Sequence, residues 1–208
     1  MIIAVDGPMA SGKGTIARAL AARFGLPHLD TGSLYRATGV AVLDAGIDPS
    51  DEQACARAAR SLKIAEIDEV RIRTAEAGAM ASRIAVLTGV RNALFELQRD
   101  FATQPGGAVL DGRDIGTVIC PDADVKLYVT ADSSTRARRR WEELTACGET
   151  ISLGEMLAQT RERDRRDAER ADAPMRPADD ATLLDTSSLS IDAAVAQAVS
   201  IVEKRQKA

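Results

Sequence analysis

The sequence predicts an α/β protein with a three-layer α/β/α core around a five-stranded parallel sheet. Two observations indicate this class. Short, continuous apolar runs recur along the chain, as expected for strands that are buried on both faces of a parallel sheet. Segments with the apolar spacing of helices lie between these runs. The length of 208 residues suits one such domain with appended segments.

The first strand is predicted at the apolar run Ile2–Val5, which leads directly into a glycine-rich stretch of the form GxxxxGK. Glycines in such a loop let the backbone approach a polyphosphate, and the lysine binds the β- and γ-phosphates at a helix N-terminus. The sequence therefore predicts a phosphate-binding loop. Its expected phosphate-binding residues are Gly7, Pro8, Met9, Ala10, Ser11, Gly12, Lys13, Gly14 and Thr15.

A helix is predicted after the loop, because Ile16, Leu20 and Phe24 fall on one helical face. The hydroxyl residue that usually follows the lysine is displaced by one position, since Gly14 stands there and Thr15 comes next. This form occurs in small nucleotide kinases. The alternative interpretation is a glycine-rich turn before an ordinary helix.

A second short strand is predicted over 27–30, followed by a helix over 34–45 whose start is favoured by the polar residues 30–33. In an open parallel sheet the ligand crevice lies at the carboxyl ends of the strands. We therefore expect Thr31 and Arg36 at this crevice.

Residues 62–101 predict an insertion between core segments. An alanine-rich helix is expected over 52–62, and the alternation of apolar and charged residues up to Thr74 then predicts a hairpin of two short strands around Asp68 and Glu69. Two helices are predicted next, over 76–86 and 91–101, with a break at Gly89.

Buried strands are predicted over 108–110 and 125–129, a final strand at 183–184 and a closing helix over 191–202. Asp111 directly follows the first of these strands. With the phosphate-binding loop it gives two halves of a Mg-nucleotide site, in which Thr15 and Asp111 hold the metal directly or through its water shell.

The composition excludes several classes of protein. A net charge of −4 argues against a general nucleic-acid binder. Cys55, Cys120 and Cys147 are odd in number and widely spaced, so they support neither a disulfide framework nor a zinc site. No apolar segment reaches the length of a membrane span, and we expect a cytoplasmic protein. His28, the single histidine, is expected to be structural.

Arginine supplies most of the positive charge, since only 5 of the 27 basic residues are lysines. An arginine-favouring genome is one explanation, and a solvated helix face is the ordinary explanation for the arginine-rich stretches 136–140 and 161–170. Phosphoryl transfer is the alternative, because guanidinium groups bring two anions together. A phosphate-monoester acceptor is largely dianionic at neutral pH, so no general base is required. A mobile segment 161–170 that closes over the phosphates would exclude water.

Four motifs together resemble those of the bacterial cytidylate kinases, which belong to the nucleoside monophosphate kinases. The motifs are 7–15, DTGSLYR at 30–36, DGRDIGT at 111–117, and RDRRD at 163–167 with Arg170. The resemblance runs nearly end to end. It implies Mg-dependent transfer of the ATP γ-phosphate to CMP or dCMP.

The resemblance also implies roles for particular residues. The catalytic residues would be Lys13, Arg113, Arg163 and Arg170. The substrate-binding residues would be Thr31, Arg36, Ser82, Arg91, Arg113, Asp114, Arg163, Asp167 and Arg170. Among them, Arg36 and Arg113 would clamp the acceptor phosphate, Ser82, Arg91 and Asp114 would read cytosine, Arg163 and Asp167 would hold the sugar, and Arg170 would reach the phosphates. Such a set should reject uracil, since cytosine presents acceptors at O2 and N3 and a donor at N4. A helix-surface Ser82 and a structural Arg113–Asp114 ion pair are the alternatives.

The chain is therefore expected to be a single domain over 1–208, with core segments 1–61, 102–144 and 173–208, an acceptor-binding insertion at 62–101 and a lid at 145–172. Its expected partners are ATP, Mg²⁺ and CMP or dCMP, without nucleic acid or membrane, and we expect a monomer. Thr31 replaces the serine of better-known members, and the stretch 62–74 is shorter than their sheet-bearing insert. Alternatives are a kinase for UMP or a non-nucleotide metabolite, and a non-catalytic ATP-responsive binding module.

Overall fold

The computed structural model describes residues 1–206, apart from the side chain of Ala65. The predicted core segment 173–208 thus ends in two residues that lie outside the described part. The chain divides into two compact units. The larger unit is formed by Met1–Leu29 with Phe101–Ala208, and the smaller unit by Asp30–Asp100. The predicted boundaries of core, insertion and lid stay predictions.

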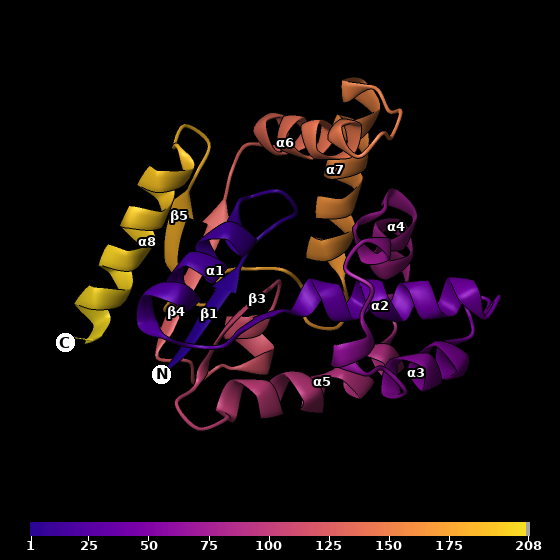
Figure 1. Cartoon of the computed structure of the whole chain (residues 1–208), viewed down its shortest axis with the longest axis horizontal. Coiled ribbons are helices and arrows are strands. Elements are labelled where there is room, and N and C mark those ends of the chain that lie inside the picture. The colour runs from indigo at the N-terminus through magenta and orange to yellow at the C-terminus, as the bar shows by residue number, and fades with distance from the viewer. Residues whose placement is uncertain (207–208) are drawn as a thin grey trace. The chain divides into compact units, whose positions relative to one another are not determined.

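Figure 1 labels the helices α1–α8 and four of the five strands. The larger unit contains β1 (Ile2–Asp6), α1 (Lys13–Phe24), β3 (Ala108–Gly112), the π-helical turn η3 (Ile115–Ile119), β4 (Val125–Thr130), α6 (Ser133–Ala146), α7 (Leu153–Glu169), β5 (Thr182–Asp185) and α8 (Ile191–Gln206). The smaller unit contains α2 (Thr31–Asp44), α3 (Glu52–Arg60), the 3₁₀ turns η1 (Ile64–Glu66) and η2 (Arg71–Arg73), and α4 (Ala75–Ile84). Two elements cross between the units, β2 (His28–Asp30) and α5 (Thr88–Thr103).

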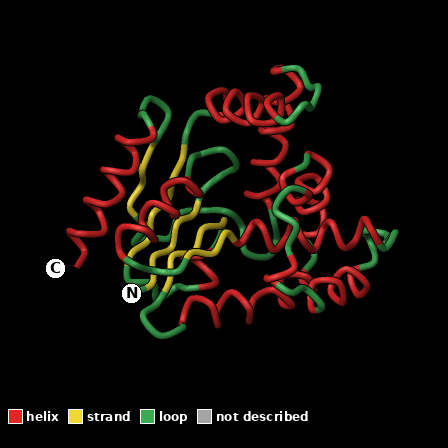
Figure 2. Tube along the Cα trace, in the orientation of Figure 1, coloured by secondary structure: helices red, strands yellow, loops and turns green. Residues whose placement is uncertain are grey.

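The five strands form a sheet in the order β2-β3-β1-β4-β5, seen in yellow in Figure 2. β1 is the central strand and pairs in parallel with β3 and β4, while β4 pairs in parallel with β5. The predicted class, an α/β fold with a five-stranded parallel sheet and helices on both sides, is confirmed. Because the strands run in parallel, their carboxyl ends meet at one edge of the sheet, where ligands bind in such folds.

The hydrophobic core of the larger unit joins the sheet to α1 and α8. Ile3 and Val5 of β1 are fully buried in it, as the apolar run predicts, and so is Leu20 of α1. Ala194, Ala198 and Val202 bring α8 into the same core. Ile191, the first residue of α8, is by contrast 68% exposed. No helix within residues 1–206 combines the length and apolarity that a membrane span needs.

The predicted hairpin after residue 62 is wrong, because this segment forms the two turns η1 and η2. The Asp68 carboxylate accepts hydrogen bonds from the backbone of Val70 at 2.9 Å and of Arg71 at 3.1 Å, which closes a turn where a strand would have to begin. The Arg71 guanidinium also forms an ion pair with Asp44 of α2. Val70 is 79% exposed while Ile72 is 4% exposed, so the alternating residues do not share a buried face.

The helical break predicted at Gly89 lies earlier in the chain. α4 ends at Ile84, and Gly89 is already the second residue of α5. The Gly89 amide bonds to the Glu52 side chain at 2.5 Å, so this glycine is anchored inside the first turn of α5. The predicted lid, 145–172, contains the loop after α6 and all of α7, which begins with a capping box between Ser152 and Glu155.

In the smaller unit, α2 and α4 cross at close range. A Cβ on Gly39 of α2 would lie 3.1 Å from the backbone nitrogen of Ala81 and 3.3 Å from the Cβ of Met80. The helix backbones therefore touch at a point that admits no side chain. Because Ser82 follows Ala81 directly, this crossing also determines where Ser82 lies.

The crossing can be tested with a matched pair of variants. We expect Gly39→Ala to lower the free energy of unfolding by about 1 kcal/mol, because overpacking costs roughly 1–3 kcal/mol and helix propensity returns up to about 1 kcal/mol. A Cβ on Gly78 of α4 would meet no described heavy atom within 4 Å. We expect Gly78→Ala to raise the free energy of unfolding by about 0.5–1 kcal/mol. Urea unfolding measures both, and a Gly39→Ala protein as stable as the wild type would contradict the crossing.

Candidate active site

The predicted phosphate-binding loop connects β1 to α1 at the carboxyl edge of the sheet. A Cβ on Gly7 would collide with the carbonyl oxygen of Val129, so only glycine lets the loop lie against β4. Gly12, which precedes α1, has a φ of 90°, in the left-handed region that favours glycine. Ala10 has a φ of 58°, a strained conformation for a residue with a side chain. The surrounding structure must hold the loop in this shape.

Side chains outside the loop hold its carbonyl groups. The pairs are Met9 with Arg136 at 3.3 Å, Ala10 with Arg139 at 3.5 Å, and Ser11 with Thr186 at 2.8 Å. The C=O and N–H groups of a trans peptide point in opposite directions. Carbonyls bound outward therefore turn the next amides toward the inside of the loop, where successive N–H groups form an anion site. The sequence analysis missed these three donors.

Lys13, Asp111 and His28 lie together at the ends of α1, β3 and β2. Asp111 Oδ1 is 3.9 Å from Lys13 Nζ, and Asp111 Oδ2 is 2.8 Å from His28 Nε2. The Asp111 carboxylate is almost fully buried. The sequence analysis brought Lys13 and Asp111 to one site but gave His28 only a structural role. The role of His28 could not be predicted without knowing that β2 and β3 are neighbours in the sheet.

Few protein side chains are available for a metal ion. Within residues 1–206, no cluster of three or more His, Cys, Asp or Glu side chains is suited to hold one. Thr15, whose Oγ1 accepts a hydrogen bond from Arg18 at 3.4 Å, and Asp111 carry the predicted ligands. A hydroxyl and a carboxylate are hard oxygen donors, and Mg²⁺ at phosphate sites uses one or two such ligands with water and phosphate oxygens. The residues present therefore fit the ion.

Three of the predicted site arginines gather around the carboxylate of a fourth predicted residue, Asp167, in the larger unit. Arg113 Nε donates to Asp167 Oδ2 at 2.9 Å, and Arg170 Nε lies 3.4 Å from the Asp167 carbonyl oxygen. Burial raises the pKa of Asp167, but the positive charges of Arg113, Arg163 and Arg170 outweigh it and hold the pKa below its usual value. Three guanidinium groups thus lie around one ionised aspartate beside the DGRD segment.

A second ion pair fastens α6 to α7. The buried Arg136 of α6 donates to both carboxylate oxygens of Asp164 on α7, at 2.9 and 2.6 Å. Arg163 Nη1 lies 3.4 Å from Met9 Sδ, so α7 also contacts the phosphate-binding loop. Arg165, by contrast, is exposed and pairs with glutamates of its own helix. The arginine-rich stretches therefore contain buried arginines that join two helices as well as exposed arginines on a solvated helix face.

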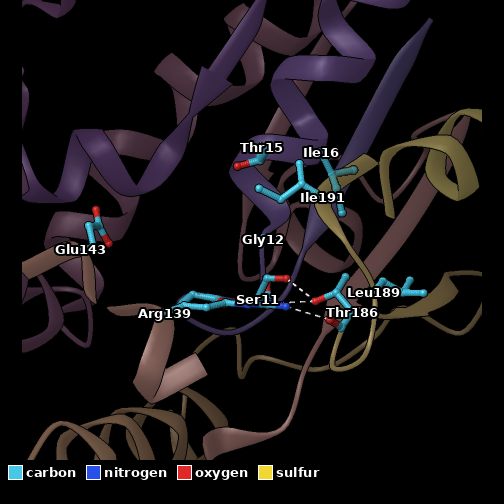
Figure 3. A pocket seen from close by; sticks show the side chains of 10 residues that line it. Ser11, Gly12, Thr15, Ile16, Arg139, Glu143, Thr186, Leu189 and Ile191 are labelled. Carbon is cyan, nitrogen blue, oxygen red and sulfur yellow. Dashed lines mark hydrogen bonds between the residues drawn. The ribbon is translucent and has the colours of Figure 1, made fainter. Parts of the chain in front are cut away.

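A pocket of about 270 Å³ adjoins the loop on the side of α6 and β5 (Figure 3). Its lining residues are Ala10, Ser11, Gly12, Thr15, Ile16, Arg139, Glu143, Thr186, Leu189 and Ile191. Arg139 Nη1 donates to Thr186 Oγ1 at 3.1 Å and Nη2 to the Thr186 carbonyl at 2.8 Å, as the dashed lines show. The apolar side chains of Ile16, Leu189 and Ile191 also line the pocket. The sequence analysis did not predict this pocket, because its walls come from segments far apart in the chain.

Asp6, the last residue of β1, is a buried carboxylate that the sequence analysis also missed. It is 5% exposed and accepts hydrogen bonds from the backbone of Ile115 at 2.8 Å and of Gly116 at 2.7 Å. Burial raises the pKa of Asp6 to about 7, although the two N–H bonds oppose this, and the charges of Asp114 and Arg113 act in opposite directions. The bond pattern ties β1 to the segment that follows Asp114.

The smaller unit holds four more of the predicted substrate-binding residues, Thr31, Arg36, Ser82 and Arg91, while Asp114 lies in the larger unit. Arg36 on α2 donates to the Ile72 carbonyl at 3.3 Å. Ser82 on α4 is 6% exposed, and its Oγ has no hydrogen-bond partner among the described residues. Arg91 on α5 is 7% exposed. A buried hydroxyl without a partner is costly, which indicates a place for a ligand atom.

These features define a class of protein. A parallel sheet whose central strand leads into a GxxxxGK loop, with a carboxylate from the next strand near the loop lysine, is a P-loop nucleotide-binding fold, and the adjoining arginines are those of a phosphotransferase. The family model described as "Cytidylate kinase" matches residues 3–204. The chain belongs to the cytidylate kinase family, as its motifs predict.

Curated relatives support this assignment. A "Cytidylate kinase" of Xanthobacter autotrophicus is 58% identical over 206 residues, covering 99% of both chains. One of Methylocella silvestris is 57% identical over 203 residues, covering 98% of this chain and 94% of the relative. Among solved structures, an uncharacterised protein from Eubacterium ventriosum matches with a TM-score of 0.53 and 16% identity, covering 98% of each chain, which shows the fold alone.

The raised pKa of Asp6 predicts a pH-dependent stability. The folded-state pKa of about 7 exceeds the ordinary 3.8, so the folded protein retains a proton that the unfolded chain has released between these values. The contribution of Asp6 to stability is thus fully present below pH 4 and is lost as the pH rises through 7. We expect the free energy of unfolding, relative to Asp6→Asn, to fall by up to about 1.4 kcal/mol per pH unit from pH 5 to 7. Urea unfolding at several pH values measures this, and a pH-independent difference would contradict it.

Proposed function

We propose that this protein transfers the γ-phosphate of ATP to CMP or dCMP in a Mg-dependent reaction that yields ADP and CDP or dCDP. The observation that carries the proposal is the pairing, in one unit, of the Lys13 loop with the arginines around Asp167. A loop alone would bind a polyphosphate. Guanidinium groups beside it supply what a second, acceptor phosphate needs. Membership of the cytidylate kinase family supports the same reaction.

The donor ATP would bind with its phosphates on residues 7–15 and its base in the adjoining pocket. The inward-turned amides of the loop and the Lys13 ammonium would hold the β- and γ-phosphates. In the pocket, the polar groups of Arg139 and Thr186 already bond to one another, so apolar contact with Ile16 and Leu189 would dominate binding of the base.

Mg²⁺ would be held by Thr15 and Asp111, directly or through water. The ion neutralises charge on the phosphates during transfer. His28 contributes by fixing one oxygen of Asp111 through their 2.8 Å contact. Lys13 lies on the other oxygen, so the carboxylate has a defined orientation before nucleotide binds.

The acceptor would be bound by the substrate-binding residues that the resemblance implies. Arg36 and Arg113 would clamp its phosphate, while Ser82, Arg91 and Asp114 would bind cytosine. The unpartnered Ser82 hydroxyl supports this, since its oxygen can accept a hydrogen bond from the N4 amino group of cytosine. Arg163 and Asp167 would hold the sugar, Arg170 the phosphates, and Thr31 the acceptor at the start of α2.

The transfer would need positioning and charge stabilisation more than proton removal. The acceptor phosphate is largely dianionic at neutral pH, with a second pKa of about 6, and attacks without a base. Lys13, Arg113, Arg163 and Arg170 would stabilise the charge on the transferred group. Closure of the segment 145–172 would exclude water and prevent hydrolysis of ATP. The cytoplasmic location and the monomeric state stay predictions.

The acceptor can be identified with a coupled assay of ADP release. We expect turnover with CMP and dCMP in the presence of ATP and Mg²⁺, and much slower turnover with UMP and AMP, because uracil and adenine present different donors and acceptors to Ser82, Arg91 and Asp114. Equal or faster turnover with UMP would refute the cytosine assignment. Tight ATP binding without acceptor-dependent turnover would instead favour a non-catalytic binding module.

Ser82→Ala separates function from stability. We expect kcat/KM for CMP to fall by about tenfold, the effect of one lost hydrogen bond of about 1–1.5 kcal/mol. The free energy of unfolding should stay constant or rise by up to about 1 kcal/mol, because a buried hydroxyl without a partner is removed. Ser61→Ala is the matched control, since Ser61 is exposed in the same unit and its hydroxyl donates to the Ala58 carbonyl at the end of its own helix. Unchanged CMP kinetics in Ser82→Ala would remove Ser82 from the acceptor site.

A further inference from the structure

Asp6 holds two neighbouring amides with the two oxygens of one carboxylate. Oδ1 accepts from Ile115 and Oδ2 from Gly116, the first two residues of η3. The first N–H groups of a helical turn have no partner within the turn, and Ile115 is fully buried. Without Asp6, both donors would be buried and unsatisfied. The carboxylate is therefore the partner that lets this turn begin inside the protein.

The requirement is for a carboxylate in particular. An asparagine at this position offers one oxygen and one NH₂ group, so the NH₂ would face an N–H donor. Burial of a negative charge is costly, and the raised pKa of Asp6 shows that this cost is present here. The two carboxyl oxygens of Asp6 accept from two neighbouring donors that one asparagine cannot satisfy together.

Asp6 lies between two segments of the proposed site, so its hydrogen bonds connect the two. Asp6 is followed directly by Gly7, the first residue of the phosphate-binding loop. Ile115 directly follows Arg113 and Asp114, the residues proposed to bind the acceptor. The ladder between β1 and β3 ends at the pair Asp6 and Gly112, so the chain leaves the sheet there. Beyond that pair, the Asp6 side chain continues the connection between the two segments.

We propose that Asp6 is a positioning residue for phosphoryl transfer, which sets Arg113 and Asp114 in register with the phosphate-binding loop by holding the Ile115 and Gly116 amides. The proposal rests on the function proposed above. Asp6 would not contact either nucleotide itself, because it is buried and its oxygens are bonded to these two amides. It acts through the start of η3, so its loss should affect the acceptor more strongly than the donor.

The test compares Asp6→Asn with Asp124→Asn at pH 8, where Asp6 and the CMP phosphate are ionised in the wild type. Asp124 also bonds a backbone amide of β1, that of Ile2 at 2.6 Å, but at the opposite end of the strand. We expect Asp6→Asn to lower kcat/KM for CMP by about 10- to 100-fold, the effect of a misplacement near 1 Å. The dissociation constant for ATP alone, from calorimetry, should change less than threefold. Asp124→Asn should match the wild type in both.

The outcomes are distinct. Loss of CMP efficiency with ATP binding retained supports the positioning role. Unchanged CMP kinetics, or equal losses for ATP and CMP as expected from general destabilisation, would overturn it. A wild-type protein without CMP turnover would instead refute the proposed function.

If Asp6→Asn does not fold, amide hydrogen exchange of the wild type provides the answer. We expect the Ile115 and Gly116 amides to exchange as slowly in the free protein as the amides of β1, because Asp6 holds them before substrate binds. Fast exchange that becomes slow only with CMP would show that the substrate, and not Asp6, sets this segment, and would overturn the proposal.

Discussion

The active site depends on the outward orientation of the carbonyl groups in the phosphate-binding loop. A loop of nine residues with a strained Ala10 would not keep its amides directed at one point unaided. Arg136, Arg139 and Thr186 bind three successive carbonyls, and β4 presses against Gly7. The donors come from α6 and from the residue after β5. The order of strands in the sheet, with β4 beside β1 and β5 beside β4, is what brings these segments to the loop.

Two arginines of the larger unit pair with aspartates of α7. Arg136 pairs with Asp164, and Arg113 pairs with Asp167, so each of these two guanidinium groups has a carboxylate that fixes its plane. The exposed Arg165 pairs only with glutamates of its own helix. The interleaving of arginine and aspartate along 161–170 thus serves two purposes. One set of pairs positions charge at the site, and the other covers the solvent side.

The elements predicted correctly are those whose conformation depends on interactions between residues close in sequence. The strand, loop and helix from Ile2 to Phe24 follow from an apolar run, a glycine pattern and a helical stripe, and the motifs identified the family. The hairpin after residue 62 was wrong because the Asp68 turn and the Arg71–Asp44 ion pair outweigh the alternation of apolar residues. His28, Asp6 and Thr186 could not be assigned, because their partners lie 83, 109 and 175 residues away along the chain. Such contacts require the order of the strands, which no single segment contains.

The carbonyl anchors also bear on how this loop can be moved between proteins. A designer who transplants residues 7–15 onto another strand–helix unit carries over the glycines and the lysine but leaves Arg136, Arg139 and Thr186 behind. The graft would match the motif in sequence while its peptide planes turn freely. The unit to transfer in design is therefore the loop together with β4, α6 and the residue after β5. Recombination between homologous genes must keep the same segments together.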